Sequence, residues 1–167
     1  MTRIKVLGLD LSLTCTGVAD PDGITRRIRP GARRDATRLA WIRQQLSVDL
    51  DGGIDLAAIE GYSFGSRSSQ AHSLGELGGV IRTHLHDQGV AYIAVPPATL
   101  KTYATGKGNA GKTAVIIAAR DRLGYPGTDD NEADALWLWA FGLDLAGQPP
   151  IQLPQLHRRA LDKITLP

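Results

Sequence analysis

Three carboxylates stand where an α/β protein places reacting groups. Asp10 ends the first apolar, strand-like segment and Glu60 ends a later one. Asp134 lies in the first turn of the last long helical segment, with Asp130 four residues earlier on the same face. Sites in open α/β sheets form at the ends of strands. If the two strands are neighbours, Asp10 and Glu60 lie side by side, and a helix packed over that edge adds Asp134.

This concentration of negative charge indicates a metal site. Carboxylates held together repel one another, and Mg²⁺ binds to one or two carboxylates together with a substrate phosphate. Two such ions, about 3.5–4 Å apart, can activate water and stabilise the leaving 3′ oxygen of a phosphodiester. Each acid also has an ordinary structural interpretation. Asp10 could begin a turn, Glu60 could be a solvated strand end, and Asp129, Asp130 or Asn131 could cap the last helix.

Length and composition predict one soluble globular domain. The chain has 167 residues, of which 43% are hydrophobic and 22% charged, enough for one domain with a sizeable core. No uncharged stretch is long enough to span a bilayer, and the first residues lack the apolar segment of a signal peptide. The lone Cys15 excludes an internal disulfide and a cysteine metal site. We therefore expect a cytoplasmic protein without a membrane partner.

Positive charge is clustered along the chain although the net charge is only +2. One cationic cluster lies at 26–38 and a second at 157–163, near the end of the sequence, whereas acids are concentrated in the segment 129–134. Cationic patches beside a carboxylate cluster suit a polyanion that is held by the patches and cut between them. A solvated charged surface is the alternative. The first cluster consists of six arginines in thirteen positions, Arg26, Arg27, Arg29, Arg33, Arg34 and Arg38.

The order of elements predicts an α/β fold with a mixed central sheet flanked by helices. The first strand, 3–10, alternates two apolar faces, as a strand covered on both sides does. A Pro-Asp-Gly turn at 21–23 indicates an antiparallel meander. Residues 1–147 are expected to form the domain, and 148–167 a Pro-containing tail that extends as an arm. A further strand is expected at 54–60 and a buried strand at 90–95, and helices are expected at 35–46, 69–88, 114–122 and 131–145.

Residues 106–113 match the phosphate-loop pattern G-x-x-x-x-G-K-[ST], which raises the possibility of a nucleotide hydrolase. Such a loop must follow a buried strand directly. Here two prolines and the helix-prone segment 98–103 intervene, and the remaining residues are too few for the further strands of that fold. ATP or GTP binding is therefore the weaker interpretation.

Three motifs resemble RuvC-type Holliday junction resolvases of the ribonuclease H-like superfamily. Residues 8–19, Gly-Leu-Asp-Leu-Ser-Leu-Thr-Cys-Thr-Gly-Val-Ala, resemble the first motif of that family. Residues 58–61, Ala-Ile-Glu-Gly, resemble its second acidic motif, and residues 131–136, Asn-Glu-Ala-Asp-Ala-Leu, its C-terminal acidic helix. The resemblance covers roughly residues 3–145 and implies a ribonuclease H-like fold.

The resemblance also implies an activity. It points to a homodimeric endonuclease that cleaves four-way junctions or other branched DNA with Mg²⁺, or with Mn²⁺ as a substitute, and two ions in each site. Asp10, Glu60 and Asp134 become the metal ligands. The usual fourth acid is replaced by Asn131, so Asp130 is assigned in its place, with Asp129 as the alternative.

Basic and aromatic residues complete the expected DNA site. By resemblance, Lys101 and Lys112 approach the scissile phosphates, Lys112 belongs to the catalytic set, and Lys107 is a further DNA contact. Tyr62 and Phe64 follow Glu60, where an aromatic ring can stack on an unpaired base; packing inside the protein is the alternative. Two other functions stay open: a non-catalytic module that binds branched DNA, and a short actin-like nucleotide-binding fragment, which would lack its second lobe.

Overall fold

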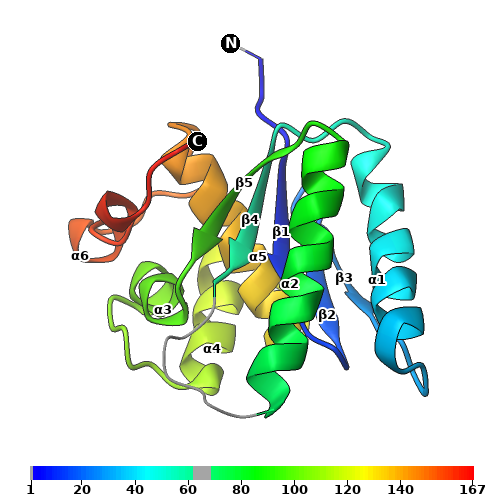
Figure 1. Ribbon diagram of the computed structural model, residues 1–167. Coiled ribbons are helices and arrows are strands. Elements are labelled where there is room, and N and C mark those ends of the chain that lie inside the picture. The colour runs from blue at the N-terminus through cyan, green and yellow to red at the C-terminus, as the bar shows by residue number, and fades with distance from the viewer. Residues whose placement is uncertain (1, 62–68) are drawn as a thin grey trace.

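The protein is built on a five-stranded mixed sheet (Figure 1). The computed structural model describes residues 2–61 and 69–167, the side chains of 69–71 excepted. The strand order is β3-β2-β1-β4-β5; β1, β2 and β3 form an antiparallel meander, and β4 and β5 run parallel to β1. The predicted α/β class and mixed sheet are confirmed. The strands are β1 (Val6–Asp10), β2 (Thr16–Ala19), β3 (Thr25–Ile28), β4 (Leu56–Glu60) and β5 (Ala91–Val95).

Helices cover both faces of the sheet (Figure 1). One face packs against α1 (Asp35–Leu50) and α2 (Ser69–Asp87). The other packs against α3 (Pro97–Thr105), α4 (Lys112–Leu123) and α5 (Asp130–Leu145). The chain ends in α6 (Gln155–Arg158) and a short 3-10 turn, η1 (Leu161–Lys163). Within the described residues, no helix is both long and apolar enough to cross a membrane.

Strand β1 is buried on both sides, as its apolar pattern predicts. Val6 faces the layer of α3, α4 and α5, and Leu7 and Leu9 face α1 and α2; all three side chains are fully buried. Strand β5 differs from the prediction of a buried strand. It is the edge of the sheet, so Ile93 is buried while Tyr92 on its opposite face is 37% exposed.

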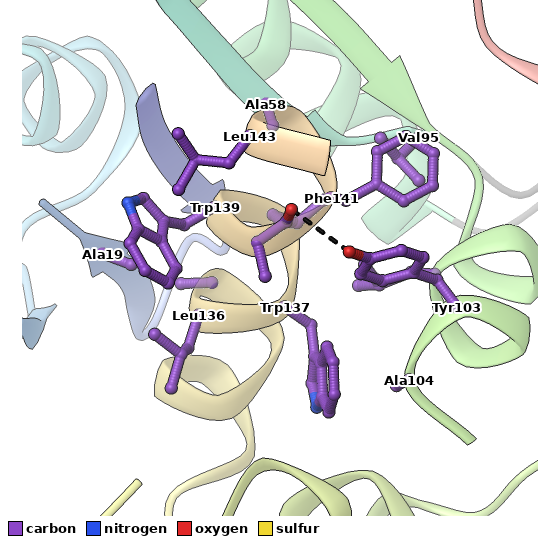
Figure 2. Packing of buried hydrophobic residues seen from close by; sticks show 14 of the residues in the cluster. Ala19, Ala58, Val95, Tyr103, Ala104, Leu136, Trp137, Trp139, Phe141 and Leu143 are labelled. Carbon is purple, nitrogen blue, oxygen red and sulfur yellow. Dashed lines mark hydrogen bonds between the residues drawn. The ribbon is translucent and has the colours of Figure 1, made fainter. Parts of the chain in front are cut away.

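Helix α5 forms the centre of its layer. It is apolar on nearly every side, as a helix enclosed by the core is. Figure 2 shows Tyr103 of α3 beside the helix, with its hydroxyl donating a hydrogen bond to the Ala140 carbonyl at 3.2 Å. The Tyr103 ring makes edge contacts with Trp137 and Phe141, with ring centroids 5.9 and 5.1 Å apart. Trp137 is therefore a core residue.

The C-terminal segment returns to the domain, so the prediction of an extended arm is wrong. Leu153 and Ala160 are buried in the same core as α5. The His157 ring is buried and its Nδ1 forms a hydrogen bond with the Tyr103 carbonyl oxygen at 2.8 Å. Arg158 donates to the buried Asp144 carboxylate at 2.8 and 3.1 Å. These long-range contacts fasten the segment to α3 and α5.

Candidate metal centre

The register of two parallel strands places Asp10 beside Glu60. Leu9 of β1 pairs with Ile59 of β4, and the next residue of each strand is the acid. Successive side chains in a strand alternate between the two faces. Asp10 therefore shares the face of Val6, which is the face that α5 covers. As predicted from the sequence, β1 and β4 are neighbours, and Asp10 and Glu60 stand at the same end of the sheet.

Two glycines, one in β1 and one in β2, let α5 approach the sheet closely beside these acids. A Cβ added to Gly8 would lie 2.1 Å from the Ala135 carbonyl oxygen, and one added to Gly17 would lie 2.0 Å from the Asn131 carbonyl oxygen. Backbone occupies both positions, so no side chain fits there. This role of the two glycines is not evident from the sequence, although both stand in the first motif. Their contacts set the height of α5 above the sheet and thus the position of Asp134.

The structure brings Asp10, Glu60 and Asp134 together. Within the described part of the chain, these three residues form a group in which one oxygen from each lies within 4.8 Å of the others. All three are partly buried. Three carboxylate oxygens at this spacing form a hard-donor set of the kind that Mg²⁺ accepts.

Burial and mutual repulsion make the cluster unfavourable in its fully ionised form. Burial, followed by the charges of Glu60 and Asp134, raises the pKa of Asp10 well above its usual value. Burial also raises the pKa of Glu60. For Asp134, burial and the charges of Glu60 and Asp130 raise the pKa from 3.8 to about 7. A bound cation would offset both the cost of burying the carboxylates and their mutual repulsion, because it stabilises the ionised form of each acid.

The two candidates for a fourth acid have different positions. Asp129 is the N-cap of α5, where its side chain accepts hydrogen bonds from the Asn131 and Glu132 backbone N–H groups at 3.0 and 3.2 Å. It also pairs with Arg27 at 2.9 Å, so its carboxylate stabilises the helix start. Asp130 lies outside the three-residue group, and its charge raises the pKa values of Asp10 and Asp134.

Two of the three predicted lysines act on the cluster. Lys101 on α3 and Lys112 at the start of α4 both lower the pKa of Glu60 and Asp134 through their positive charge. Lys112 also forms an ion pair with Asp130, although its side chain is 79% exposed. Lys107 is exposed in the loop between α3 and α4. Cationic groups thus stand beside the acids on the side of α3 and α4.

The phosphate-loop pattern is not a nucleotide-binding loop in this fold. Residues 106–111 connect α3 to α4, and 112–113 begin α4, so the pattern does not follow a strand directly, as predicted from the sequence. Gly106 caps the C-terminus of α3 with a φ of 81°, and Gly111 is the N-cap of α4. Glycines at these positions are explained by helix capping. Tyr62 and Phe64, predicted to contact DNA bases, lie outside the described residues.

An open hollow adjoins the acidic cluster between β5 and α2. Glu60 forms part of its wall, and Leu11, Tyr92 and Pro96 supply apolar surface. Its volume is about 320 Å³. Of the three clustered acids, Glu60 is the one that lines this hollow, which lies on the α2 side of the sheet.

The comparisons with known proteins concern the fold. No family model matches the chain, and no curated protein matches it. A Thermus thermophilus RuvC structure matches with a TM-score of 0.68 at 22% identity, over 87% of this chain and 98% of that one. A structure of T. thermophilus RuvC in complex with a Holliday junction substrate matches with a TM-score of 0.72 at 21% identity, over 87% and 97%. The chain therefore has the ribonuclease H-like fold of RuvC, and the resemblance seen in the sequence is confirmed at the level of the fold.

Proposed function

We propose that this protein is a metal-dependent endonuclease that cleaves Holliday junctions or related branched DNA by two-metal-ion hydrolysis. The observation that carries the proposal is that Asp10, Glu60 and Asp134 meet, with oxygens within 4.8 Å of one another, at the carboxyl ends of the neighbouring strands β1 and β4. These acids come from β1, β4 and α5, which are far apart in the chain. The choice of branched DNA rests on the likeness to RuvC, one structure of which holds a Holliday junction substrate.

The acids have distinct roles in this proposal. Asp10, Glu60 and Asp134 would hold Mg²⁺, or Mn²⁺ as a substitute, and Asp130, which lies outside that group, would help to hold a second ion. Bound ions of this kind polarise a phosphodiester and lower the pKa of a coordinated water. The raised pKa values of Asp10 and Asp134 support this assignment, because such shifts mark sites that a cation stabilises.

Lysines and aromatic residues hold the DNA. Lys112 is exposed enough to reach a phosphate, and Asp130 neutralises it when no DNA is bound. Lys101 adds positive charge on the same side of the cluster. We assign Lys107 to a more distant phosphate, and Tyr62 and Phe64 to unpaired bases at the branch. A homodimer would present two such sites to a junction, one for each of the strands that are cut.

The test is a cleavage assay with four-way junction, flap and plain duplex, in Mg²⁺ and in chelator. We expect paired symmetric nicks in the junction that chelator abolishes. Asp10→Asn should keep junction binding but reduce cleavage by about 10³-fold, which corresponds to about 4 kcal/mol of transition-state stabilisation. Asp121→Asn, an exposed acid on α4, is the matched control and should cleave normally.

Other results would change the proposal in different ways. Preferential flap cutting keeps the metal nuclease and changes its substrate. Tight junction binding without a product in Mg²⁺ or Mn²⁺ refutes catalysis and favours a binding module. Full activity of Asp10→Asn refutes the assigned metal site.

A further inference from the structure

The fold divides the N-terminal arginine cluster into two parts. Arg26 pairs with Asp49, and Arg27 pairs with Asp129 at 2.9 Å. The nearest side-chain contact of Arg29 with an acid is also to Asp129, at 3.9 Å. These three arginines are neutralised by the protein itself. The arginines of the second part have no such carboxylate partners in the described part of the chain.

Of the remaining arginines, Arg33 and Arg34 lie between β3 and α1, and Arg38 and Arg43 lie on α1. Among the described residues, Arg33, Arg34, Arg38 and the more distant Arg43 have no carboxylate within 4.0 Å. Strand β3 runs in the same direction as β1, since both are antiparallel to β2. The start of α1 therefore lies at the end of the sheet where Asp10 stands (Figure 1). We call these four arginines together with Trp41 the arginine face of α1.

Two hollows are lined by arginines of this face, and none of the three clustered acids lines either hollow. The first is lined by residues 11–14, which directly follow Asp10, and by Arg38. The second, of about 750 Å³, lies between α1 and α2 and is lined by Arg33, Trp41 and Arg43. Arg38 Nε donates to the Arg33 carbonyl oxygen at 2.7 Å, which links a residue that lines the first hollow to one that lines the second.

The second hollow combines a held cation with an aromatic ring. The Arg33 guanidinium lies 4.4 Å from the centre of the Trp41 ring, and its Nη1 donates to the Pro30 carbonyl at 2.9 Å. Stacking on the ring leaves the edges of the planar guanidinium available for phosphate oxygens. Fixing the side chain in advance reduces the entropy lost on binding.

The charge around the second hollow is positive on balance. Arg33 and Arg43 are its cations, and Asp87 on α2 is the acid that lines it. His84 on α2 forms a hydrogen bond with Ser47 at 3.0 Å. Burial and the nearby Arg43 lower the pKa of His84, so its ring is neutral near pH 7. An anionic partner is therefore favoured.

The spacing of the cations suits a nucleic acid. An α-helix rises about 1.5 Å per residue, so Arg38 and Arg43 stand about 7.5 Å apart along α1. This is the length of about two base pairs of duplex DNA, which carries regularly spaced phosphates. Five residues of α-helix also turn through about 140°, so Arg38 and Arg43 leave α1 in different directions, and Arg38 lines the first hollow while Arg43 lines the second.

We propose that the arginine face of α1 holds one duplex arm of the branched DNA as that arm leaves the acidic cluster. The inference rests on the proposed function for its substrate. The position of these arginines at the end of the sheet where Asp10 stands, and their lack of a carboxylate partner among the described residues, favour DNA over a protein partner. In this arrangement the arm crosses the first hollow, and its phosphates contact Arg38, Arg33 and Arg43 in turn.

The first test measures junction binding by fluorescence anisotropy in chelator at several salt concentrations. Arg38→Gln/Arg43→Gln should weaken binding about tenfold and reduce the salt slope by about two, because each lost phosphate contact lowers it by about one. Arg122→Gln removes an exposed cation from α4, on the opposite face of the sheet, and should bind like the unchanged protein. An unchanged slope in the double variant overturns the proposal.

The second test locates the DNA directly. Thr37 lines the second hollow, so Thr37→Cys in a Cys15→Ser background can carry a photo-crosslinker. We expect crosslinks to a duplex arm at a fixed distance from the cut, and none from the matched Asp121→Cys on α4. Crosslinks to a second protein copy instead of DNA overturn the proposal.

The two proposals fail in distinguishable ways. If the unchanged protein never cuts a junction in Mg²⁺ but crosslinks to its arm from Thr37→Cys, the nuclease assignment fails and the DNA contact of the arginine face stands. If it nicks junctions while both the crosslink and the change in salt slope are missing, that DNA contact fails and the nuclease stands.

Discussion

Asp134→Asn removes one of the three mutually repelling charges of the cluster, and we expect it to stabilise the chelator-treated protein above neutral pH. Burial and the charges of Glu60 and Asp130 raise the pKa of Asp134 from 3.8 to about 7 in the folded chain. Unfolding exposes the side chain to water and restores its ordinary proton affinity. The folded state therefore binds this proton more tightly than the unfolded state does.

The sign of the pH dependence follows from that difference. Below about pH 4 both states are protonated, and the group has no effect on stability. As the pH rises toward 7, the unfolded state loses its proton first, so the folded protein becomes progressively less stable. A tenfold difference in proton affinity is worth about 1.4 kcal/mol, so the interval from 3.8 to about 7 corresponds to about 4 kcal/mol. Asn does not ionise, and the variant should be more stable at pH 8 by at most this amount.

Urea unfolding can be followed through the buried Trp137 and Trp139 between about pH 4 and pH 8. With chelator, the stability difference between Asp134→Asn and the unchanged protein should grow with pH, whereas Asp121→Asn should track the unchanged protein. Mg²⁺ at about 100 times its dissociation constant should stabilise the unchanged protein by about 2.7 kcal/mol and the Asn variant by less. A difference that stays constant with pH, or an equal response to Mg²⁺, would refute the reasoning.

Further substitutions test the packing beneath the site, a buried ion pair and a phosphate contact. Gly17→Ala places a methyl group 2.0 Å from the α5 backbone, so it should lower the free energy of unfolding by about 1–3 kcal/mol and reduce cleavage. The control is Gly79→Ala on α2, where the methyl group meets nothing within 4 Å. It should raise the free energy of unfolding by up to about 1 kcal/mol. Arg158→Ala leaves the buried Asp144 carboxylate without its cation and should lower the free energy of unfolding by about 3 kcal/mol; a loss below about 0.5 kcal/mol contradicts a stabilising role for this pair. Lys112→Gln should lower the salt slope of junction binding by about one, and an unchanged slope argues against its phosphate contact.

The sequence alone predicted the features that depend on local pattern. The two-sided apolar alternation of residues 4–11 identified a strand covered on both faces, because side chains in a strand alternate strictly. The positions of Asp10 and Glu60 at strand ends, and of Asp134 near a helix start, were enough to predict their meeting. The motif resemblance predicted the fold. These signals lie within short segments, so they can be recognised without knowing which distant residues are in contact.

Other features depended on contacts between residues far apart in the chain. The sequence left Asp129 and Asp130 as alternatives for the fourth acid. Only the folded structure shows Asp129 capping α5 and pairing with Arg27, a partner 102 residues away. The division of the arginines into neutralised and free groups has the same origin, because it depends on which acids the fold brings near them.

The largest errors also concerned tertiary contacts. Prolines after residue 148 suggested an extended arm, but burial of Leu153 and the pairing of Arg158 with Asp144 bind that segment to the core. The apolar residues of 90–95 predicted a buried strand, although the place of β5 at the edge of the sheet leaves one of its faces uncovered. Local sequence determined which segments form strands and helices and which acids stand at their ends. The tertiary structure decided which charges are neutralised and which surfaces stay open, because both depend on neighbours that only folding brings together.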